Sequence, residues 1–140
     1  PNNFTSSFDQ ESLEPLSYFE EMLKKFIYVG CFNVEGTILG ICGFMPYDHQ
    51  EKTSHKGIVT GFYVRKEYRG QGFAKKLMRD LLERVEERGY RNVIIRATRN
   101  NPKAHQLYRN CGFKDIGMEK KSLFIDGKFV AEYVMQMIFD

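Results

Sequence analysis

The chain has 140 residues, of which 42% are hydrophobic and 28% charged, values typical of one globular domain with a sizeable core. They exclude a disordered, collagen-like or coiled-coil chain, and no apolar run approaches the roughly 18 residues of a membrane-spanning helix. The net charge of +3 is too small to predict nucleic-acid binding, but it is compatible with a small anionic ligand.

The first half of the chain predicts one helix followed by strands. Residues 1–12 are polar and aperiodic, which predicts a loop, whereas apolar residues recur every three or four positions over 13–26, as in an amphipathic helix. The following segments are rich in β-branched and aromatic residues and predict strands at 27–33, 37–45 and 57–64. Because a short turn joins the first two strands, we expect them to form an antiparallel hairpin.

The second half alternates helices and strands more clearly. An apolar stripe from Ala74 to Val85 predicts a helix that Gly89 ends. A short buried strand is expected next, then a helix that starts at Pro102, two extended segments and a final strand. The predicted ranges are 93–97 for the strand, 102–110 for the helix, 113–118 and 121–125 for the extended segments, and 129–139 for the last strand. Asp126 and Gly127 form a two-residue hairpin signal between the last two.

This order of elements predicts a mixed α/β (α+β) fold in a single domain that covers residues 1–140. The three cysteines, Cys31, Cys42 and Cys111, are widely spaced and form no metal-binding motif, so we expect reduced thiols in a cytoplasmic protein and no metal. No signal peptide is visible at the start, where Pro1 stands in place of Met.

The segment 69–74, Arg-Gly-Gln-Gly-Phe-Ala, follows a predicted strand and opens the long helix. Helix N-termini carry unpaired N–H groups and the positive end of the dipole, and glycines let an anion approach the backbone. Basic residues flank this turn: Arg65, Lys66, Lys75 and Lys76. The alternative is a simple Gly-rich turn, and neither a dinucleotide fingerprint nor a P-loop is present.

A second motif begins at Asn101, where a strand gives way to a helix. Tyr108 lies one helical turn beyond Ala104 on the same face, and a phenol in a cleft can act as a general acid. The alternative is that Tyr108 is a core aromatic residue with a satisfied hydroxyl.

Together the two motifs resemble the core of the GNAT superfamily of N-acetyltransferases over residues 57–113, and the similarity extends over roughly 30–140. The family pattern Arg/Gln-x-x-Gly-x-Gly/Ala is matched by Arg69, Gly72 and Ala74. The downstream pattern Asn-x-x-Ala-x-x-Leu-Tyr-x-x-x-Gly-Phe is matched by Asn101, Ala104, Leu107, Tyr108, Gly112 and Phe113.

The resemblance implies a mixed central sheet flanked by helices, with acetyl-CoA bound in a V-shaped gap between the parallel strands 57–64 and 93–97. The acetyl group would pass directly to an amine, and Tyr108 would protonate the departing thiolate. The pyrophosphate would lie on the backbone of Arg69, Gly70, Gln71, Gly72, Phe73 and Ala74. The pantetheine arm would contact Phe62, Tyr63, Val64 and Asn101, and the other cofactor-binding residues would be Lys103, Ala104 and Tyr108.

Two features depart from the family pattern. The family's first strand is not visible here, so we expect that residues before Pro1 are missing from this sequence. Many members carry a glutamate on the central strand, where Ile58 and Val59 stand here, so the general base lies elsewhere. We expect deprotonation through ordered water with Glu132 or His55 as the terminal acceptor, and each is an ordinary surface residue in the alternative interpretation. Glu119, near the penultimate strand, is a third candidate for the base. We further expect a surface position for His105 and core packing for Cys111.

The sequence therefore predicts a cytoplasmic, acetyl-CoA-dependent N-acetyltransferase that acts on a primary amine of a small molecule or peptide. Its partners would be acetyl-CoA and the amine acceptor, without nucleic acid, membrane or metal, in a monomer or homodimer. The main alternative is a non-catalytic acyl-CoA-binding regulatory module. A third interpretation, a nucleic-acid-binding domain, is weakened by the modest net charge.

Overall fold

The computed structural model describes residues 14–48 and 50–140, in which strands alternate with helices. In chain order the elements are α2 (Leu16–Lys25), β1 (Ile27–Phe32), β2 (Ile38–Pro46), β3 (Lys56–Val64), α3 (Phe73–Glu87), β4 (Asn92–Thr98), α4 (Pro102–Asn110), β5 (Lys114–Ile125) and β6 (Lys128–Ile138). The predicted loop at 1–12 and residue 13 of the predicted first helix lie outside the described residues.

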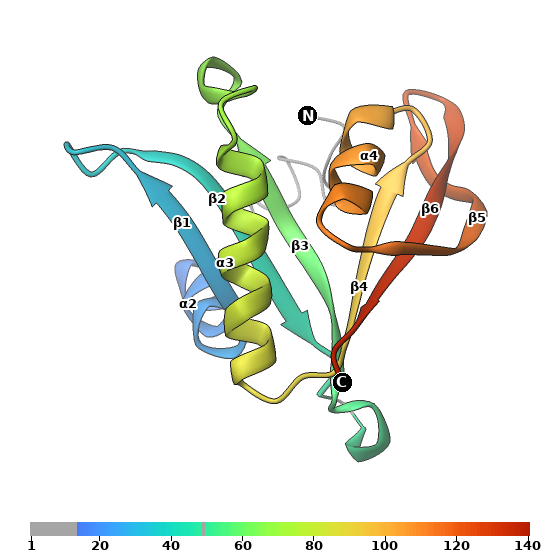
Figure 1. Ribbon diagram of the computed structural model, residues 1–140, viewed down its shortest axis with the longest axis horizontal. Helices are drawn as coiled ribbons and strands as arrows, with labels where there is room; N and C mark the ends of the chain where they lie inside the picture. The colour runs from blue at the N-terminus through green and yellow to red at the C-terminus, as the bar shows by residue number, and fades with distance from the viewer. Residues whose placement is uncertain (1–13, 49) are drawn as a thin grey trace.

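The strands form one six-stranded sheet in the order β1-β2-β3-β4-β6-β5. Every neighbouring pair is antiparallel except β3 and β4, which are parallel. These two pair at only three positions near their starts, Lys56 with Asn92, Gly57 with Val93 and Ile58 with Ile94. Beyond that point they diverge, so that the sheet opens like a V between them (Figure 1). The predicted mixed sheet with splayed parallel strands and flanking helices is confirmed.

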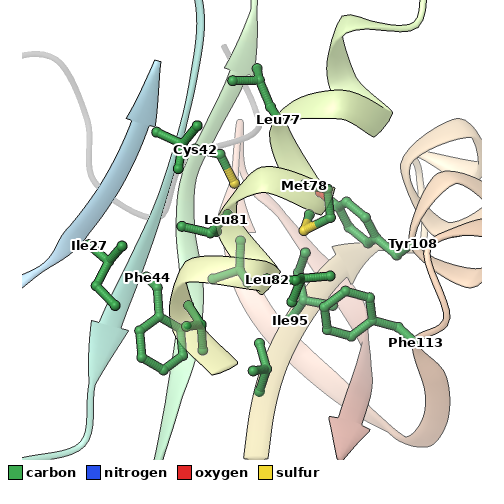
Figure 2. Close-up of a cluster of buried hydrophobic side chains, with 14 of the residues drawn as sticks. Ile27, Cys42, Phe44, Leu77, Met78, Leu81, Leu82, Ile95, Tyr108 and Phe113 are labelled. Carbon is green, nitrogen blue, oxygen red and sulfur yellow. The ribbon is translucent and has the colours of Figure 1, made fainter. Parts of the chain in front are cut away.

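The V has two arms: β1, β2 and β3 form the first, and β4, β6 and β5 form the second. The predicted apolar stripe of α3 packs against the first arm. Its side chains at three- and four-residue spacing are all buried: Leu77, Met78, Leu81, Leu82 and Val85. They pack against the inner faces of β1 and β2, from which Ile27, Cys42 and Phe44 project (Figure 2). At the other side of the same core lie Ile95 and two aromatic rings, Tyr108 and Phe113, of the second arm (Figure 2). One apolar core thus joins the two arms, and it continues beyond the last paired residues of β3 and β4.

The hairpin signal at the end of the chain is confirmed in detail. Asp126 and Gly127 have φ values of 48° and 74°, the two positive angles that a two-residue turn of this kind requires. The two extended segments predicted at 113–118 and 121–125 are one strand, β5, whose pairing with β6 is interrupted after Glu119. Lys121 in this interruption also has a positive φ, 54°. Among the described residues, no helix is long and apolar enough to span a membrane.

Candidate functional site

The 69–74 turn leads from β3 into α3, as the sequence predicts. Gly70 and Gly72 have φ values of 75° and 85°, in the left-handed region, and a Cβ at either would meet open space. Glycine is therefore favoured here by backbone conformation. Gly72 is the N-cap and has no side chain to offer, and the first helical hydrogen bond runs from Lys76 N to the Gly72 carbonyl oxygen at 3.1 Å. The amides before Lys76 in this first turn are placed to bind an anion.

Arg69 fastens this turn to the end of β3. Its Nε donates to the Val64 carbonyl oxygen at 2.9 Å, and its guanidinium lies 5.6 Å from the centre of the Tyr63 ring. The Arg69 side chain thus fixes the distance between the strand end and the anion-binding amides. Gln71 is anchored in a similar way, since its Nε2 donates to the Glu67 carbonyl oxygen at 3.2 Å.

Two adjoining cavities start at this turn. The first has a volume of about 310 Å³ and lies between the turn, the end of β3 and α4. It is lined by Val64, Tyr68, Arg69, Gly70, Gly72, Ala74, Lys75 and Leu107. The second, of about 570 Å³, shares Gly72 and Lys75 with the first and extends along α3 towards Cys111 and Phe139. Its wall carries Lys75, Lys76 and Arg79 and, further along α3, Glu83 and Glu86. The predicted flanking cations Arg65 and Lys66 line neither cavity.

A β-bulge in β3, which the sequence analysis missed, lies where the strand leaves β4. The pairing with β2 shifts between Ile41 and Gly43, opposite Gly61, whose φ is +61°. Before the bulge Val59 belongs to the core, and after it Val64 does, so one extra residue changes the phase of the strand. Phe62 consequently packs against the core, and Tyr63 lies on the surface. Gly61 lies inside a predicted strand, and a glycine at such a position is the sequence feature that could have indicated the bulge.

Beyond Ile58, β3 has a partner strand on the β2 side only, because β4 has turned away. Backbone groups of β3 that point towards β4 are therefore available to an extended ligand in the V. This is the edge formed by Phe62, Tyr63 and Val64, although the Val64 carbonyl oxygen already accepts from Arg69.

Tyr108 lies on α4, which follows β4 and belongs to the second side of the V. The residue is 7% exposed, and its ring centre lies 6.0 Å from that of Phe62 and 6.4 Å from that of Phe113. Burial raises the pKa of Tyr108, and the nearby thiols Cys42 and Cys111 raise it further, so the phenol keeps its proton at neutral pH. No described residue hydrogen-bonds to the hydroxyl, and no fully enclosed side-chain oxygen of the described part lacks a partner. The described residues therefore leave this hydroxyl for a ligand.

The start of α4 holds the rest of the second motif. Asn101 is the N-cap, and its Oδ1 accepts from the Ala104 amide at 3.1 Å, which leaves its Nδ2 for a ligand. Ala104 packs against the core, while Lys103 is exposed and lines neither cavity.

Glu132 is a buried carboxylate on β6, with 5% of the residue exposed. It pairs with Thr98 at the carboxyl end of β4, on the side where the V opens. Ser122 Oγ donates to its Oε2 at 2.6 Å, and Arg96 Nη1 lies 3.7 Å from the same oxygen. Arg96 also hydrogen-bonds Glu119. Because the neighbouring Tyr133 stacks on His105 of α4, Glu132 lies on the sheet face away from α4.

The structure does not bring His55 to this region. His55 is exposed and immediately precedes β3, and its carbonyl oxygen accepts from the amides of Arg91 and Asn92. It lies at the closed end of the V, six residues or about 20 Å of extended chain from Gly61.

The expected surface position of His105 is wrong. Only 13% of its side chain is exposed, because the ring stacks on Tyr133 with centres 4.1 Å apart. Its Nε2 lies 2.6 Å from Asp115 Oδ1, and Arg109 Nε donates to the other oxygen of Asp115 at 2.9 Å. The hydrogen bond from His105 is the main cause of a lowered Asp115 pKa, to which Arg109 adds. Helical spacing alone did not reveal this, because the partners come from β5 and β6.

Groups of histidine, cysteine and acidic residues that could hold a metal ion are absent from the described part of the chain. Its three cysteines form no disulfide. Cys111 is half-buried and lines the larger cavity, so it packs at the edge of the core that we expected it to join.

The model of the acetyltransferase (GNAT) family matches residues 2–113. Human N-acetyltransferase 8B is 32% identical over 90 residues, which are 62% of this chain and 40% of that protein, so the chain spans less than half of this relative. Spermidine N(1)-acetyltransferase from Vibrio cholerae is 25% identical over 134 residues, 91% of this chain and 75% of that protein. A GNAT superfamily phosphinothricin acetyltransferase from Sinorhizobium meliloti, solved in complex with AcCoA, aligns with a TM-score of 0.79 at 22% identity, covering 96% of this chain and 70% of that one.

Proposed function

Because the chain belongs to the GNAT family of acetyltransferases, we propose that it transfers the acetyl group of acetyl-CoA directly to a primary amine of a small molecule or peptide. The observation that carries this proposal is the V between β3 and β4, which has an anion-binding helix start on one side and Tyr108 on the other. A V with a free strand edge suits a long, thin ligand with a charged end, and acetyl-CoA is such a ligand.

In this proposal the pyrophosphate lies on the amides of the 69–74 turn, with Gly72 at the point of closest approach. Lys75, Lys76 and Arg79 along the larger cavity attract the remaining phosphate of the nucleotide. The pantetheine arm extends along Phe62, Tyr63 and Val64 and meets the Nδ2 of Asn101 on the opposite side. Lys103 contributes only long-range charge, since it lines neither cavity.

The chemistry is a single displacement at the thioester carbonyl. The amine nitrogen attacks the carbonyl carbon, the C–S bond breaks and an amide forms, without a covalent enzyme intermediate. The departing thiolate takes the proton of Tyr108, which burial keeps on the phenol. Backbone N–H groups of β3 beyond its last pair with β4 stabilise the negative charge that develops on the carbonyl oxygen.

The amine must lose a proton before or during attack, and we assign the proton acceptor to Glu132. It lies at the open end of the V on the face away from α4, so that the acceptor and the donor of protons approach from opposite faces of the sheet. Glu119 is engaged by Arg96, and His55 lies at the closed end of the V, so neither suits this role as well.

We further propose that residues 1–140 act as one domain in the cytoplasm, as a monomer or homodimer, without metal, nucleic acid or membrane. The unpaired thiols of the described residues are compatible with a reducing compartment.

Thiol release from acetyl-CoA with a panel of amines tests the proposal. The panel consists of spermidine, lysine and a short peptide with a free N-terminal amine, and each is compared with a no-amine control. Release that depends on one of these amines supports the transferase. Acetyl-CoA binding by calorimetry without release from any of them would instead favour the regulatory module.

A further inference from the structure

The β5–β6 hairpin contains an unusual bulge beside Glu132. Glu119 pairs with Glu132 and Leu123 pairs with Val130, so three residues of β5, 120–122, stand opposite the single residue Ala131. Lys121 in this bulge has φ 54°, a backbone conformation that residues other than glycine rarely adopt. Such strain persists only where the surrounding structure enforces it, and bulges commonly turn a side chain in a new direction.

The 120–122 bulge brings the hydroxyl of Ser122 to the Glu132 carboxylate. Ser122 Oγ donates to Oε2 at 2.6 Å, and Glu132 is 5% exposed. The other oxygen, Oε1, accepts no hydrogen bond from residues 14–48 or 50–140, and no enclosed side-chain oxygen in those ranges lacks a partner. One oxygen of Glu132 is therefore anchored, while the other is left by the described residues for a ligand.

The charged groups around this carboxylate come from three elements. Arg96 of β4 lies 3.7 Å from Oε2, but its hydrogen bond goes to Glu119 of β5, which is the main cause of a raised Arg96 pKa. Tyr47, which follows β2, interacts electrostatically with Arg96. Among the described residues, Ser122 is thus the one donor within hydrogen-bond distance of Glu132.

We propose that Ser122 is a positioning residue, whose hydroxyl, presented by the 120–122 bulge, fixes Oε2 of Glu132 so that Oε1 faces the incoming amine. The inference rests on the proposed function, in which Glu132 accepts the proton of that amine. A hydroxyl that donates to a carboxylate favours its ionised form and restricts its rotamers. Without that donor, the Glu132 carboxylate would lose its fixed orientation.

The test compares kcat and KM for wild type, S122A, S122T, E132Q and the double variant S122A/E132Q. The acceptor is whichever of spermidine, lysine and the peptide amine the wild type acetylates fastest. Lys121→Gly is the matched control, because it relaxes the same bulge while the Ser122 hydroxyl stays. Acetyl-CoA affinity and melting temperature, measured for each variant, show that the fold and the cofactor site are intact.

We expect S122A to lower kcat about 3- to 10-fold, while KM for acetyl-CoA stays unchanged. S122T should restore kcat, and K121G should leave it unchanged. The double variant should be no slower than E132Q, since Ser122 acts only through Glu132.

Two results overturn the inference while the proposed function stands. One is an unchanged kcat in S122A, and the other is a double variant slower than E132Q by the full effect of S122A. If E132Q itself keeps wild-type kinetics, the assignment of Glu132 fails and this inference fails with it. If the wild type acetylates none of the three amines, the proposed function is contradicted first.

Discussion

The rings of Phe62 and Tyr108, with centres 6.0 Å apart, form a contact between the two arms of the V. Phe62 comes from β3 just after the Gly61 bulge, and Tyr108 comes from α4, which follows β4. The contact closes the core at the level where β3 and β4 no longer pair. Tyr108 is therefore both a core aromatic residue and a phenol between the two arms of the V, so the two interpretations of its role are compatible.

Tyr108→Phe separates these two roles, because the ring still packs and only the hydroxyl is lost. We expect unchanged acetyl-CoA affinity and a kcat lower by about 10²- to 10⁴-fold, the usual contribution of a positioned general acid. Tyr90→Phe is the matched control, since Tyr90 packs edge-on against Phe44 in the first arm of the core. Steady-state kinetics with calorimetric binding measure both quantities, and an unchanged kcat would leave Tyr108 with its packing role alone.

Gly72→Asp should abolish acetyl-CoA binding, because it places a side chain and a negative charge at the anion-binding amides. Ligand at a hundredfold excess over Kd stabilises a protein by about 2.7 kcal/mol, and we expect this thermal shift to vanish in the variant. Gly89→Asp is the control, since Gly89 has φ 87°, close to the 85° of Gly72, and open space around it. A variant at Gly72 that retains the full shift would place the pyrophosphate elsewhere.

Gly61→Ala tests the β3 bulge. A Cβ at Gly61 meets open space, so the cost arises from its φ of +61°, about 1–2 kcal/mol for a residue with a side chain. Relief of that strain would displace the strand edge that we assign to the pantetheine, and we expect kcat/KM to fall about 10- to 100-fold. Gly36→Ala, at φ +83° in the turn between β1 and β2, should cost similar stability with no loss of activity. Equal activity losses in both variants would mean that the bulge affects activity only through the stability of the fold.

The Asp115 cluster predicts a pH dependence of stability. His105, and secondarily Arg109, hold the pKa of Asp115 below its usual value in the folded state. Stability from this group is therefore complete above the unfolded-state pKa near 3.9 and is lost as pH falls through the lower folded-state pKa. We expect Asp115→Asn to lower the melting temperature at pH 7 and to converge with wild type as the pH falls below about 4. The substitution should matter less in a His105→Ala background, and an effect independent of pH would contradict the account.

The sequence predicted those features that depend on neighbours along the chain. The apolar stripe of α3 has helical spacing, and the Asp126–Gly127 turn needs only two residues with positive φ. Each of the two motifs, around Gly72 and around Asn101, lies at the start of a helix. The structure has both helices starting where they were expected.

Features that depend on partners from distant strands could not be predicted in this way. The Gly61 bulge is defined by its register with β2, and the burial of His105 depends on Tyr133 and Asp115. For Glu132, the sequence suggested a candidate base but gave no sign of Ser122, because the 120–122 bulge exists only in the pairing of β5 with β6. His55, an equal candidate in the sequence, lies at the closed end of the V, since β3 runs away from it.

The central claim is direct transfer of an acetyl group from acetyl-CoA to an amine. The most direct measurement uses acetyl-CoA labelled in the acetyl carbonyl, incubated with the chain and with spermidine, lysine or the peptide amine, and followed by mass spectrometry. The account predicts that the label appears on one of these amines as an amide, in step with thiol release and never on the protein. Label retained on acetyl-CoA with all three amines, or bound to a residue such as Cys111 before it reaches the amine, would contradict it.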